Sequence, residues 1–374
     1  MKIAWIVPGF SSDENDWCIP ALLDLARTLA TRHELHVFAL HYPYRRDRYS
    51  VFGACVHAIG GANRRGWRLP TILNAAASEV VREHRRGRFD ALHAFWVYEP
   101  GIIAAWLKRR LGVRVIVTVA GGELVNLPGI AYGLAGRRWL LRLMRWAMRQ
   151  ADVVTAGSSG PLDDVRSVAG RDASRIALAL LGVDMALFHS AGRRPETPAV
   201  LVNVGSLQAV KGHADLIRAF RFVVDRESNV RLRIAGAGEL RAELEALSAE
   251  LNLHDHVQFV GEVRHDQLPD VYRRATMFVQ ASYHEAQGMA VLEAAACGLP
   301  IVGTRVGALA DLAPDAAVAT PPGDPIRLGQ NILTVLSDPA RLRALGHAAQ
   351  DRAQKIYSLE ASVARFESLY GPEP

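Results

Sequence analysis

Short apolar runs alternate with amphipathic stretches along almost the whole 374-residue chain, and this alternation restricts the possible fold more than any other feature. In the first half, five runs have the length and composition of buried strands: KIAWIV, LHVFAL, ALHAF, VRVIVTV and DVVTAG. Helical periodicity is found at about residues 20–32, 70–86, 99–111 and 134–150. Because strands that are apolar along their whole length are buried on both faces, the pattern predicts an α/β fold with a doubly wound parallel sheet.

The same pattern restarts after a polar segment. Residues 188–198, FHSAGRRPETP, contain two prolines and interrupt the series, so we expect a linker there. The second series has the apolar runs AVLVNVG, VRLRIAG, VQFVG, MFVQAS and PIVGT, with helical periodicity around residues 212–226, 239–252, 266–275, 288–297 and 324–337. The sequence therefore predicts two Rossmann-like domains, residues 1–190 and 191–355, that face a central cleft. A helix within 356–374 is expected to pack back on the first domain.

The composition is that of a globular protein. Half of the residues are apolar, 22% are charged, and no apolar run reaches the roughly 18 residues of a membrane-spanning helix. No small-residue cleavage signal follows the first predicted strand, so we expect a cytoplasmic protein. The three cysteines are far apart and form no CxxC pair, so their spacing predicts neither a disulfide framework nor a zinc site.

Positive charge is concentrated in the first half of the chain. Residues 1–190 contain 25 lysines and arginines against 16 acidic residues, a net charge of +9, whereas the whole chain carries only +6. Such an imbalance indicates an anionic partner, which could be a phospholipid surface, a phosphorylated acceptor or a nucleic acid. No aromatic–basic motif supports the last of these, so we expect no nucleic acid.

One predicted helix, within residues 136–150, carries a stripe of arginines at helical spacing: Arg138, Arg142, Arg145 and Arg149. A basic amphipathic helix of this kind is typical of contact with a membrane surface. The commoner explanation is a domain helix whose apolar face covers the sheet while its arginines lie in water, and we favour it.

In the second half, VGSLQAVKG ends the first predicted strand. Gly205 allows the backbone to turn tightly there, and Lys211 lies at the entrance of the next helix, where its ammonium group can reach a phosphate. Taken alone, Lys211 is better explained as a solvated surface lysine.

The segment YHEAQGMAVLEAAACG, residues 283–298, places Glu293 in an otherwise apolar helix. Burying an ionised glutamate without a partner costs several kcal/mol. We therefore expect Glu293 to pair either with an arginine or with the hydroxyl groups of a ligand. Gly288 opens this helix, and the free N–H groups of residues 288–290 form an anion site aided by the helix dipole. Glu285, in the preceding loop, faces the same space.

Motifs for metal or phosphate binding are missing from the sequence. It has no GxxxxGK[ST] loop, no HExxH and no Asp-x-Asp pair, so we expect a site without a metal. The glycines of AGAGEL, residues 235–240, lack the third glycine of a dinucleotide fingerprint and predict only a tight turn from strand to helix.

Together these segments resemble the retaining glycosyltransferases of family 4, which have the two-domain architecture called GT-B. The resemblance rests on Glu285 and Glu293, separated by seven residues in EAQGMAVLEAAACGLPIVGT, on VGSLQAVKG upstream, and on LRIAGAGELRAELEALSAELNLHDHVQFVGEV between them. It covers residues 195–355 strongly and the first domain only in its layout.

The resemblance implies the transfer of a sugar from a UDP- or GDP-linked donor to an acceptor hydroxyl, with retention and without a metal or other cofactor. Glu285 would contact the donor sugar, Lys211 would neutralise the diphosphate, Glu293 would bind the ribose hydroxyls, and residues 261–263 would hold the base. The implied donor-binding residues are Gly205, Ser206, Lys211, Val263, Glu285, Gln287, Gly288, Met289, Ala290 and Glu293. Those on the acceptor side are Gly9, His93, Gly121, Gly122 and Glu123, of which His93 is better explained as a core or hydrogen-bonded residue at the end of a strand.

Two departures from the family pattern leave a second interpretation open. Many relatives have an arginine where this chain has Ser206, and a histidine where it has Ala120. The alternative is therefore a non-catalytic nucleotide-sugar-binding or assembly protein. For the enzyme, the basic first half suggests a glycan or lipid-linked acceptor in bacterial glycolipid or polysaccharide synthesis, with peripheral contact at the inner membrane face.

Overall fold

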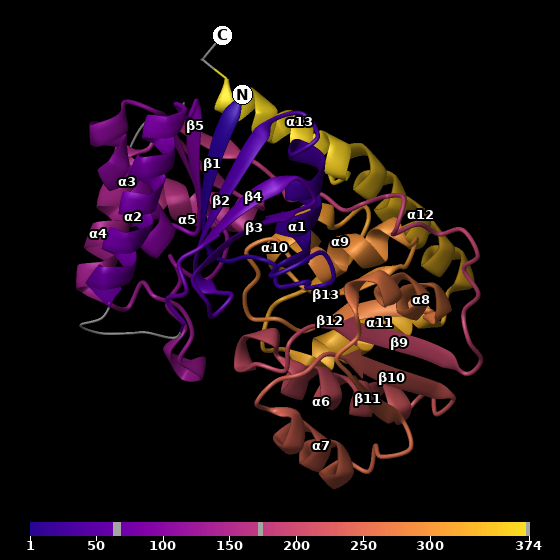
Figure 1. Ribbon diagram of the computed structural model, residues 1–374. Coiled ribbons are helices and arrows are strands. Elements are labelled where there is room, and N and C mark those ends of the chain that lie inside the picture. The colour runs from indigo at the N-terminus through magenta and orange to yellow at the C-terminus, as the bar shows by residue number, and fades with distance from the viewer. Residues whose placement is uncertain (63–68, 171–174, 372–374) are drawn as a thin grey trace. The chain divides into compact units, whose positions relative to one another are not determined.

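The computed structural model describes residues 1–62, 69–170 and 175–371, which fold into two compact units (Figure 1). The first unit comprises Met1–Gly182 together with Leu359–Pro374, and the second comprises Val183–Ser358. The borders, at 182/183 and 358/359, thus lie eight and three residues from the expected positions at 190/191 and 355/356.

The first unit is built on an eight-stranded sheet with the order β3-β4-β2-β1-β5-β6-β7-β8. The strands are β1 (Lys2–Gly9), β2 (Glu34–Tyr42), β3 (Asp47–Val51), β4 (Ala54–Ala58), β5 (Ala91–Phe95), β6 (Arg114–Val119), β7 (Val153–Ala156) and β8 (Ile176–Leu178). All neighbours are parallel except β3 and β4, which form an antiparallel edge. The five predicted strands are confirmed and include the sheet centre, whereas the edge strands β3 and β8 and the strand β4 next to β3 were not predicted.

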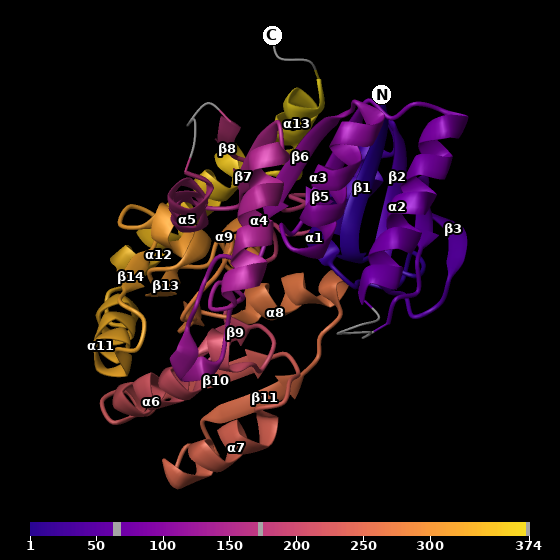
Figure 2. The same ribbon diagram turned by 90° about the vertical axis from the view of Figure 1, so that its left-hand side faces the viewer.

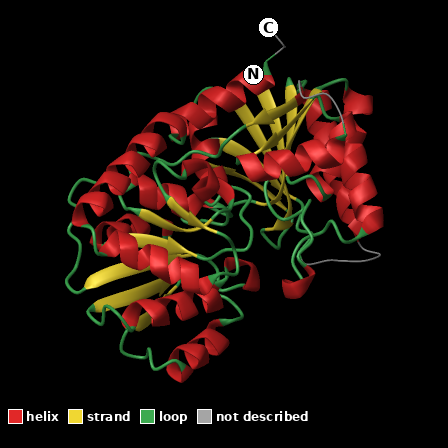
Figure 3. Ribbon diagram, turned by 180° about the vertical axis from the view of Figure 1, so that it is seen from behind, coloured by secondary structure: helices red, strands yellow, loops and turns green. Residues whose placement is uncertain are grey.

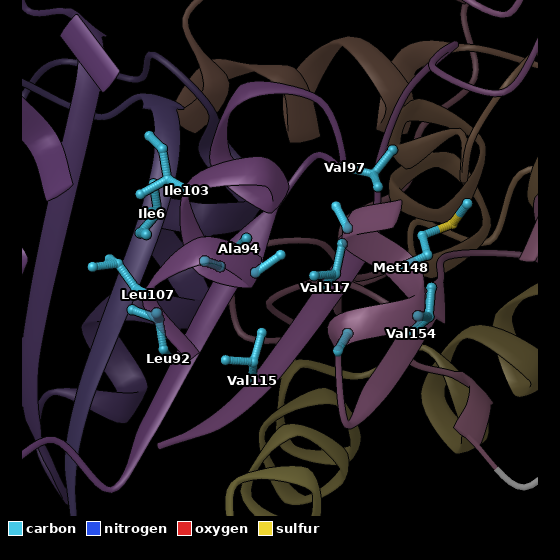
Figure 4. Close-up of a cluster of buried hydrophobic side chains, with 14 of the residues drawn as sticks. Ile6, Leu92, Ala94, Val97, Ile103, Leu107, Val115, Val117, Met148 and Val154 are labelled. Carbon is cyan, nitrogen blue, oxygen red and sulfur yellow. The ribbon is translucent and has the colours of Figure 1, made fainter. Parts of the chain in front are cut away.

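Helices cover both faces of this sheet, as the fully apolar strands require. The helices are α1 (Pro20–Leu29), α2 (Leu69–Arg86), α3 (Glu99–Leu111), α4 (Arg138–Gln150), α5 (Ser159–Ala169) and α13 (Leu359–Tyr370). Along β1, Ala4 and Ile6 pack in the core beneath α2, α3 and α4, while Ile3 and Trp5 pack in the core with α1 and α13. Figure 4 shows the first of these cores, in which Ile103, Leu107 and Met148 lie over side chains of the sheet.

The C-terminal helix α13 is tied to the first unit by a buried polar contact. The hydroxyl of Tyr370 accepts a hydrogen bond from Nε1 of Trp5 at 3.0 Å and lies 2.8 Å from Nδ1 of His93. Since Trp5 and His93 are on β1 and β5, the end of the chain is fixed against the middle of the first sheet.

The second unit has a six-stranded parallel sheet with the order β11-β10-β9-β12-β13-β14. Its strands are β9 (Ala199–Val204), β10 (Val230–Ala235), β11 (Val257–Gly261), β12 (Met277–Gln280), β13 (Ile301–Thr304) and β14 (Val318–Thr320). Its helices are α6 (His213–Val224), α7 (Arg241–Glu250), α8 (Leu268–Arg274), α9 (Met289–Ala296), α10 (Gly307–Leu312), α11 (Pro325–Leu336) and α12 (Pro339–Ile356). The strand order is that of a doubly wound Rossmann sheet, in which ligands bind where the order reverses, here beside β9. In Figure 3 each sheet has helices on both sides, which confirms the predicted fold class.

The polar segment 188–198 is not a linker between the units, as the sequence suggested, but part of the second unit. Phe188 is buried against His265 and Tyr272. The guanidinium group of Arg193 donates hydrogen bonds to the carbonyl oxygens of Ala275 and Thr276. A polar, proline-containing sequence reads as a linker, but these contacts are made with residues about 80 positions away and are not visible in the sequence.

Candidate active site

The sequence-predicted donor residues lie in loops at the carboxyl ends of β9, β11 and β12. Gly205, Ser206 and Lys211 follow β9, Val263 follows β11, and Glu285 and Gln287 follow β12. Because parallel strands end at one edge of a sheet, these loops gather at the same edge although up to 82 residues separate them in the sequence.

A cavity of about 510 Å³ opens between the carboxyl ends of β9, β10 and β11. Its lining includes Gly205, Ser206 and Val263, together with Gly236–Gly238, Glu262 and Leu268. The volume lies within the range of small-molecule sites and is sufficient for a nucleoside. Lys211 and Glu285 are not among its lining residues.

A glycine at position 236 makes the floor of this cavity possible. Gly236 has φ = +145°, and a Cβ atom there would come within 2.0 Å of the carbonyl oxygen of Gly205. The loops after β9 and β10 can therefore approach each other only because this residue has no side chain.

Lys211 and Glu285 form an ion pair beside the cavity. Nζ of Lys211 donates hydrogen bonds to both carboxylate oxygens of Glu285, at 2.7 and 2.9 Å, and Oγ of Ser282 donates to Oε1 at 2.8 Å. Both side chains remain partly exposed. Cδ of Lys211 lies 3.9 Å from the position that a Cβ of Gly205 would occupy, so the lysine stem runs beside the cavity wall. Lys211 is thus not a free surface lysine.

Helix α9 begins next to this pair. Its N-cap is Gly288, with φ = +91°, and Met289 and Ala290 form the first turn, where backbone N–H groups precede the first intrahelical hydrogen bonds. Gln287, just before the cap, is buried, and its carbonyl oxygen accepts a hydrogen bond from the N–H of Ala308. The helix start and the Lys211 ammonium group together provide positive potential in one part of the second unit.

The structure corrects the expectation for Glu293, whose hydrogen-bond partners were expected to be the ribose hydroxyls of a ligand. It is buried, with 6% of its surface exposed, and the structure supplies two protein partners for it. The hydroxyl of Tyr272 donates to Oε2 at 2.9 Å, and Nε2 of His265 lies 3.2 Å from Oε1. Burial and the adjacent carboxylate raise the pKa of Tyr272 well above its usual value, which keeps it a hydrogen-bond donor. Neither Tyr272 nor His265 belongs to a motif, so sequence reasoning missed both.

In the first unit, Glu123 is held by the backbone rather than exposed to a ligand. Its carboxylate is buried and accepts hydrogen bonds from the N–H groups of Val97, Ala120 and Gly121 at 3.2, 3.3 and 2.6 Å. Burial raises the pKa of this carboxyl group. Glu123 thus joins the loops that follow β5 and β6, a structural task that does not require an acceptor.

His93 is a core residue and offers no atom to an acceptor. It is 0% exposed, its Nδ1 lies 2.8 Å from the Tyr370 hydroxyl, and its Nε2 lies 2.7 Å from Oγ1 of Thr118. Burial lowers its pKa to about 3. Gly9 and Gly122, by contrast, do lie at the carboxyl ends of strands β1 and β6, the edge at which such sheets bind ligands.

The fold and this donor-side geometry define a two-domain α/β protein with a nucleoside-sized cavity, and comparison with known proteins gives the class. The model of glycosyl transferases group 1 matches residues 184–352, and that of Glycosyltransferase Family 4 matches residues 21–187. The chain is therefore a member of the family 4 glycosyltransferases with the GT-B fold.

Relatives of several specificities are similar to this chain. N-acetyl-alpha-D-glucosaminyl L-malate synthase of Bacillus anthracis is 25% identical, with 93% of this chain and 91% of the relative covered. D-inositol 3-phosphate glycosyltransferase 2 of Catenulispora acidiphila is 29% identical, with 81% and 76% covered.

Solved structures share the fold. Sucrose-phosphate synthase from Thermosynechococcus elongatus superimposes with a TM-score of 0.83 at 21% identity, over 99% of this chain and 98% of the other. The Anabaena protein HepE, solved in complex with UDP-glucose, has a TM-score of 0.76 at 19% identity, over 98% and 99%.

Proposed function

We propose that this glycosyltransferase moves a sugar from a nucleoside diphosphate donor to an acceptor hydroxyl with retention of the anomeric configuration. The observation that carries the proposal is the position of Lys211, whose stem borders the nucleoside-sized cavity while its ammonium group is held by Glu285. A cation beside a nucleoside pocket is what the diphosphate of such a donor requires.

In the proposed reaction, different residues of the second unit have different roles. Breaking the bond between sugar and phosphate leaves negative charge on the diphosphate, and preorganised cations and dipoles that stabilise this charge lower the barrier. We assign that role to Lys211 and to the first turn of α9. Glu285 accepts hydrogen bonds from both Lys211 and Ser282, so we assign it the orientation of the donor sugar rather than attack on it.

Retention then follows if the departing phosphate takes the proton of the acceptor hydroxyl on the same face of the sugar, as is thought for the family. That route needs no separate protein base beside Glu285. It also needs no divalent cation, since Lys211 already offers positive charge. In the described part of the chain, both groups of side chains that could hold a metal ion belong to the first unit, whereas the Lys211–Glu285 pair belongs to the second.

For the acceptor, the surface of the first unit favours a molecule held at an anionic membrane, as in bacterial glycolipid or polysaccharide synthesis. Helices α3 and α4 pack side by side on one face of the sheet (Figure 2). The Trp106 side chain is 43% exposed, with the Arg110 guanidinium 4.7 Å from its ring centroid, and Trp139 and Leu143 are 60% and 41% exposed. Interfacial tryptophans flanked by arginines are typical of peripheral membrane contact.

A basic hollow of about 1080 Å³ on the same unit extends this surface. Its arginines come from α2, the loop after it, and α3: Arg82, Arg85, Arg86, Arg88 and Arg110. Helix α4 buries Met144, Ala147 and Met148, so it is a domain helix, as favoured from the sequence. It also carries exposed apolar side chains. No helix within the described ranges is both long and apolar enough to cross a membrane.

The proposed donor is tested by calorimetric titration of the protein with UDP, GDP and ADP. UDP is the first choice, because HepE, which shares the fold, was solved with UDP-glucose. We expect one nucleotide to bind, and Lys211→Ala to weaken that binding at least 10-fold. Lys355→Ala is the matched control, because Lys355 forms only an exposed ion pair with Asp351 on α12. Equal binding of all three nucleotides, unchanged in Lys211→Ala, would contradict the proposed site.

Turnover separates the enzyme from a non-catalytic binder with the same pocket. The nucleotide that binds is supplied as its sugar conjugates, together with lipid-linked and free glycan acceptors. We expect release of the nucleoside diphosphate and a product whose NMR coupling at the anomeric carbon shows the configuration of the donor. An inverted product would refute retention, and binding without release under any acceptor would indicate the binder.

A further inference from the structure

A cluster of metal-ligating side chains lies in the first unit, outside the donor site. His36 on β2 and Cys55 and His57 on β4 face the helix α2, since the two parallel strands align His36 with Cys55 and Phe38 with His57. Both histidines are buried, at 4% and 2% exposure, and Cys55 is partly exposed. None of the roles assigned above to the donor or the acceptor uses these residues.

The outer nitrogen of each histidine ring faces a carboxylate. Nε2 of His36 lies 3.0 Å from Oε1 of Glu34, and Nδ1 of His57 lies 3.3 Å from Oε1 of Glu79. Each carboxylate is also paired with a cation, Glu34 with Lys2 and Glu79 with Arg82. Ionised carboxylates only accept hydrogen bonds, so both outer nitrogens carry hydrogen.

This arrangement leaves the two inner nitrogens facing each other. Nδ1 of His36 lies 2.9 Å from Nε2 of His57. In two neutral rings whose hydrogens are on the outer nitrogens, the inner nitrogens present lone pair against lone pair, which is repulsive. Either one additional proton or a bound cation must lie between them.

A third ligand atom favours the metal cation. Sγ of Cys55 lies 3.6 Å from Nε2 of His57, and one ligand atom from each of the three residues lies within 4.8 Å of the others. Nε of Arg48 donates a hydrogen bond to this sulfur at 3.3 Å. The thiolate is the form of a cysteine that binds metals.

We propose that His36, His57 and Cys55 bind one cation of the Zn²⁺ class through Nδ1, Nε2 and Sγ. In a tetrahedral zinc site, two nitrogen ligands lie about 3.3 Å apart and a nitrogen and a sulfur about 3.6 Å apart. The observed nitrogen–sulfur distance of 3.6 Å fits this geometry, and the rings need to separate by only a few tenths of an ångström. The three side chains leave the fourth position of a tetrahedral site for a water molecule.

The carboxylates Glu34 and Glu79 are the second shell of this site. A metal-bound histidine usually donates its other ring N–H to a carboxylate, which fixes its tautomer and orientation. A second possible group, His57, Glu79 and Glu83, is less suitable, since Arg48, Arg82 and Arg86 already pair with its carboxylates. The cation joins β2 to β4 and, through Glu79, to α2, so it stabilises this edge of the first unit.

The test is titration of the full chain with Co²⁺, whose absorption reports its ligands. We expect one equivalent to give visible bands of a tetrahedral site and a near-ultraviolet band from the thiolate. Cys55→Ser should abolish the thiolate band and weaken binding at least 10-fold. Cys18→Ser, a change at an exposed cysteine of the same unit, should leave both unchanged.

A second measurement, of the melting temperature, tests the proposal even if the Cys55→Ser variant folds poorly. Zn²⁺ should raise the melting temperature of the wild-type protein and of Cys18→Ser but not that of His57→Gln. The proposal is overturned if the folded wild-type protein binds no stoichiometric Co²⁺, in which case a shared proton joins the rings. It is equally overturned if the thiolate band persists in Cys55→Ser.

Discussion

Tyr272 donates its phenolic hydrogen to Oε2 of Glu293 across 2.9 Å, and both side chains are buried. Glu293 therefore reaches its buried position already paired, with His265 on its other oxygen. Each carboxylate oxygen keeps a further lone pair, so ribose hydroxyls could add to these partners but do not replace them. Stability and nucleotide affinity can thus be separated at this residue.

Tyr272→Phe should destabilise the protein, because it removes a hydrogen bond to a buried carboxylate. We expect a loss of about 1–3 kcal/mol in the free energy of unfolding, measured by denaturant titration. Tyr283→Phe is the control, since Tyr283 also donates to a carboxylate, Asp215, but is only partly buried, and it should cost less. Equal losses in both variants would mean that burial does not strengthen the Glu293 contact.

Glu293→Gln tests the ribose assignment directly. It keeps the shape of the side chain but replaces one acceptor oxygen by an amide NH2 group, which donates hydrogen bonds and cannot accept them. If the ribose binds here, affinity for the nucleotide falls more than 10-fold at a temperature where the variant is folded. Unchanged affinity with lowered stability would show that Glu293 is only structural.

Gly236→Ala should damage the second unit and its cavity together. The new Cβ meets the Gly205 carbonyl oxygen at 2.0 Å, and φ = +145° is strained for alanine, so we expect a loss on the order of 3 kcal/mol or more. Gly192→Ala separates the two causes, because Gly192 has φ = +75° but nothing within 4 Å, and should cost only about 1–2 kcal/mol. Similar losses in both variants, measured by denaturant titration, would count against the close approach of the two loops.

Acid should destabilise the protein through buried neutral histidines. Burial lowers the pKa of His93 to about 3, and burial together with the charge of Lys211 lowers that of His213 to about 4, against about 6.5 in the unfolded chain. Below pH 6.5 the unfolded state binds protons that the folded state does not, so stability falls as pH falls toward 4, by up to about 1.4 kcal/mol per pH unit for each histidine. Denaturant titrations at pH 7.5, 6.5, 5.5 and 4.5 measure this slope, which should be smaller in His213→Asn. A flat profile over this range would contradict the burial of these rings.

Vesicle binding tests the proposed membrane surface. Trp139→Ser and Arg142→Glu should each reduce sedimentation with vesicles that contain anionic lipid, Arg142→Glu by roughly 10-fold or more since it reverses a charge. Ile326→Ser is the control, since Ile326 is 60% exposed like Trp139 but lies on α11 of the second unit. Wild-type binding that is insensitive to anionic lipid, or equal losses in the control, would contradict this surface.

Much of the fold was predictable because local patterns encode it. The ten expected strands are all present, and α3 has the expected bounds, residues 99–111, because apolar periodicity and turn residues act within a few positions. The short strands β3, β4, β8 and β14 were not predicted, since few residues carry the pattern there. The segment 188–198 was misread because its contacts with residues 265–276 depend on packing rather than on local composition.

The sequence alone determined the class of fold and the family. It also singled out the side chains that we propose for the donor, a lysine after one strand and two glutamates after another. Only the tertiary structure decided what each of them touches. The sheet order places β12 beside β9, which brings Glu285 to Lys211 across 74 positions, and it brings Tyr272 under Glu293. Strand pairing likewise brings His36, Cys55 and His57 together, and their spacing in the sequence does not predict this cluster. Neighbours in a sheet are chosen by the burial of whole strands, so the contacts of single side chains follow from the fold and not from local sequence.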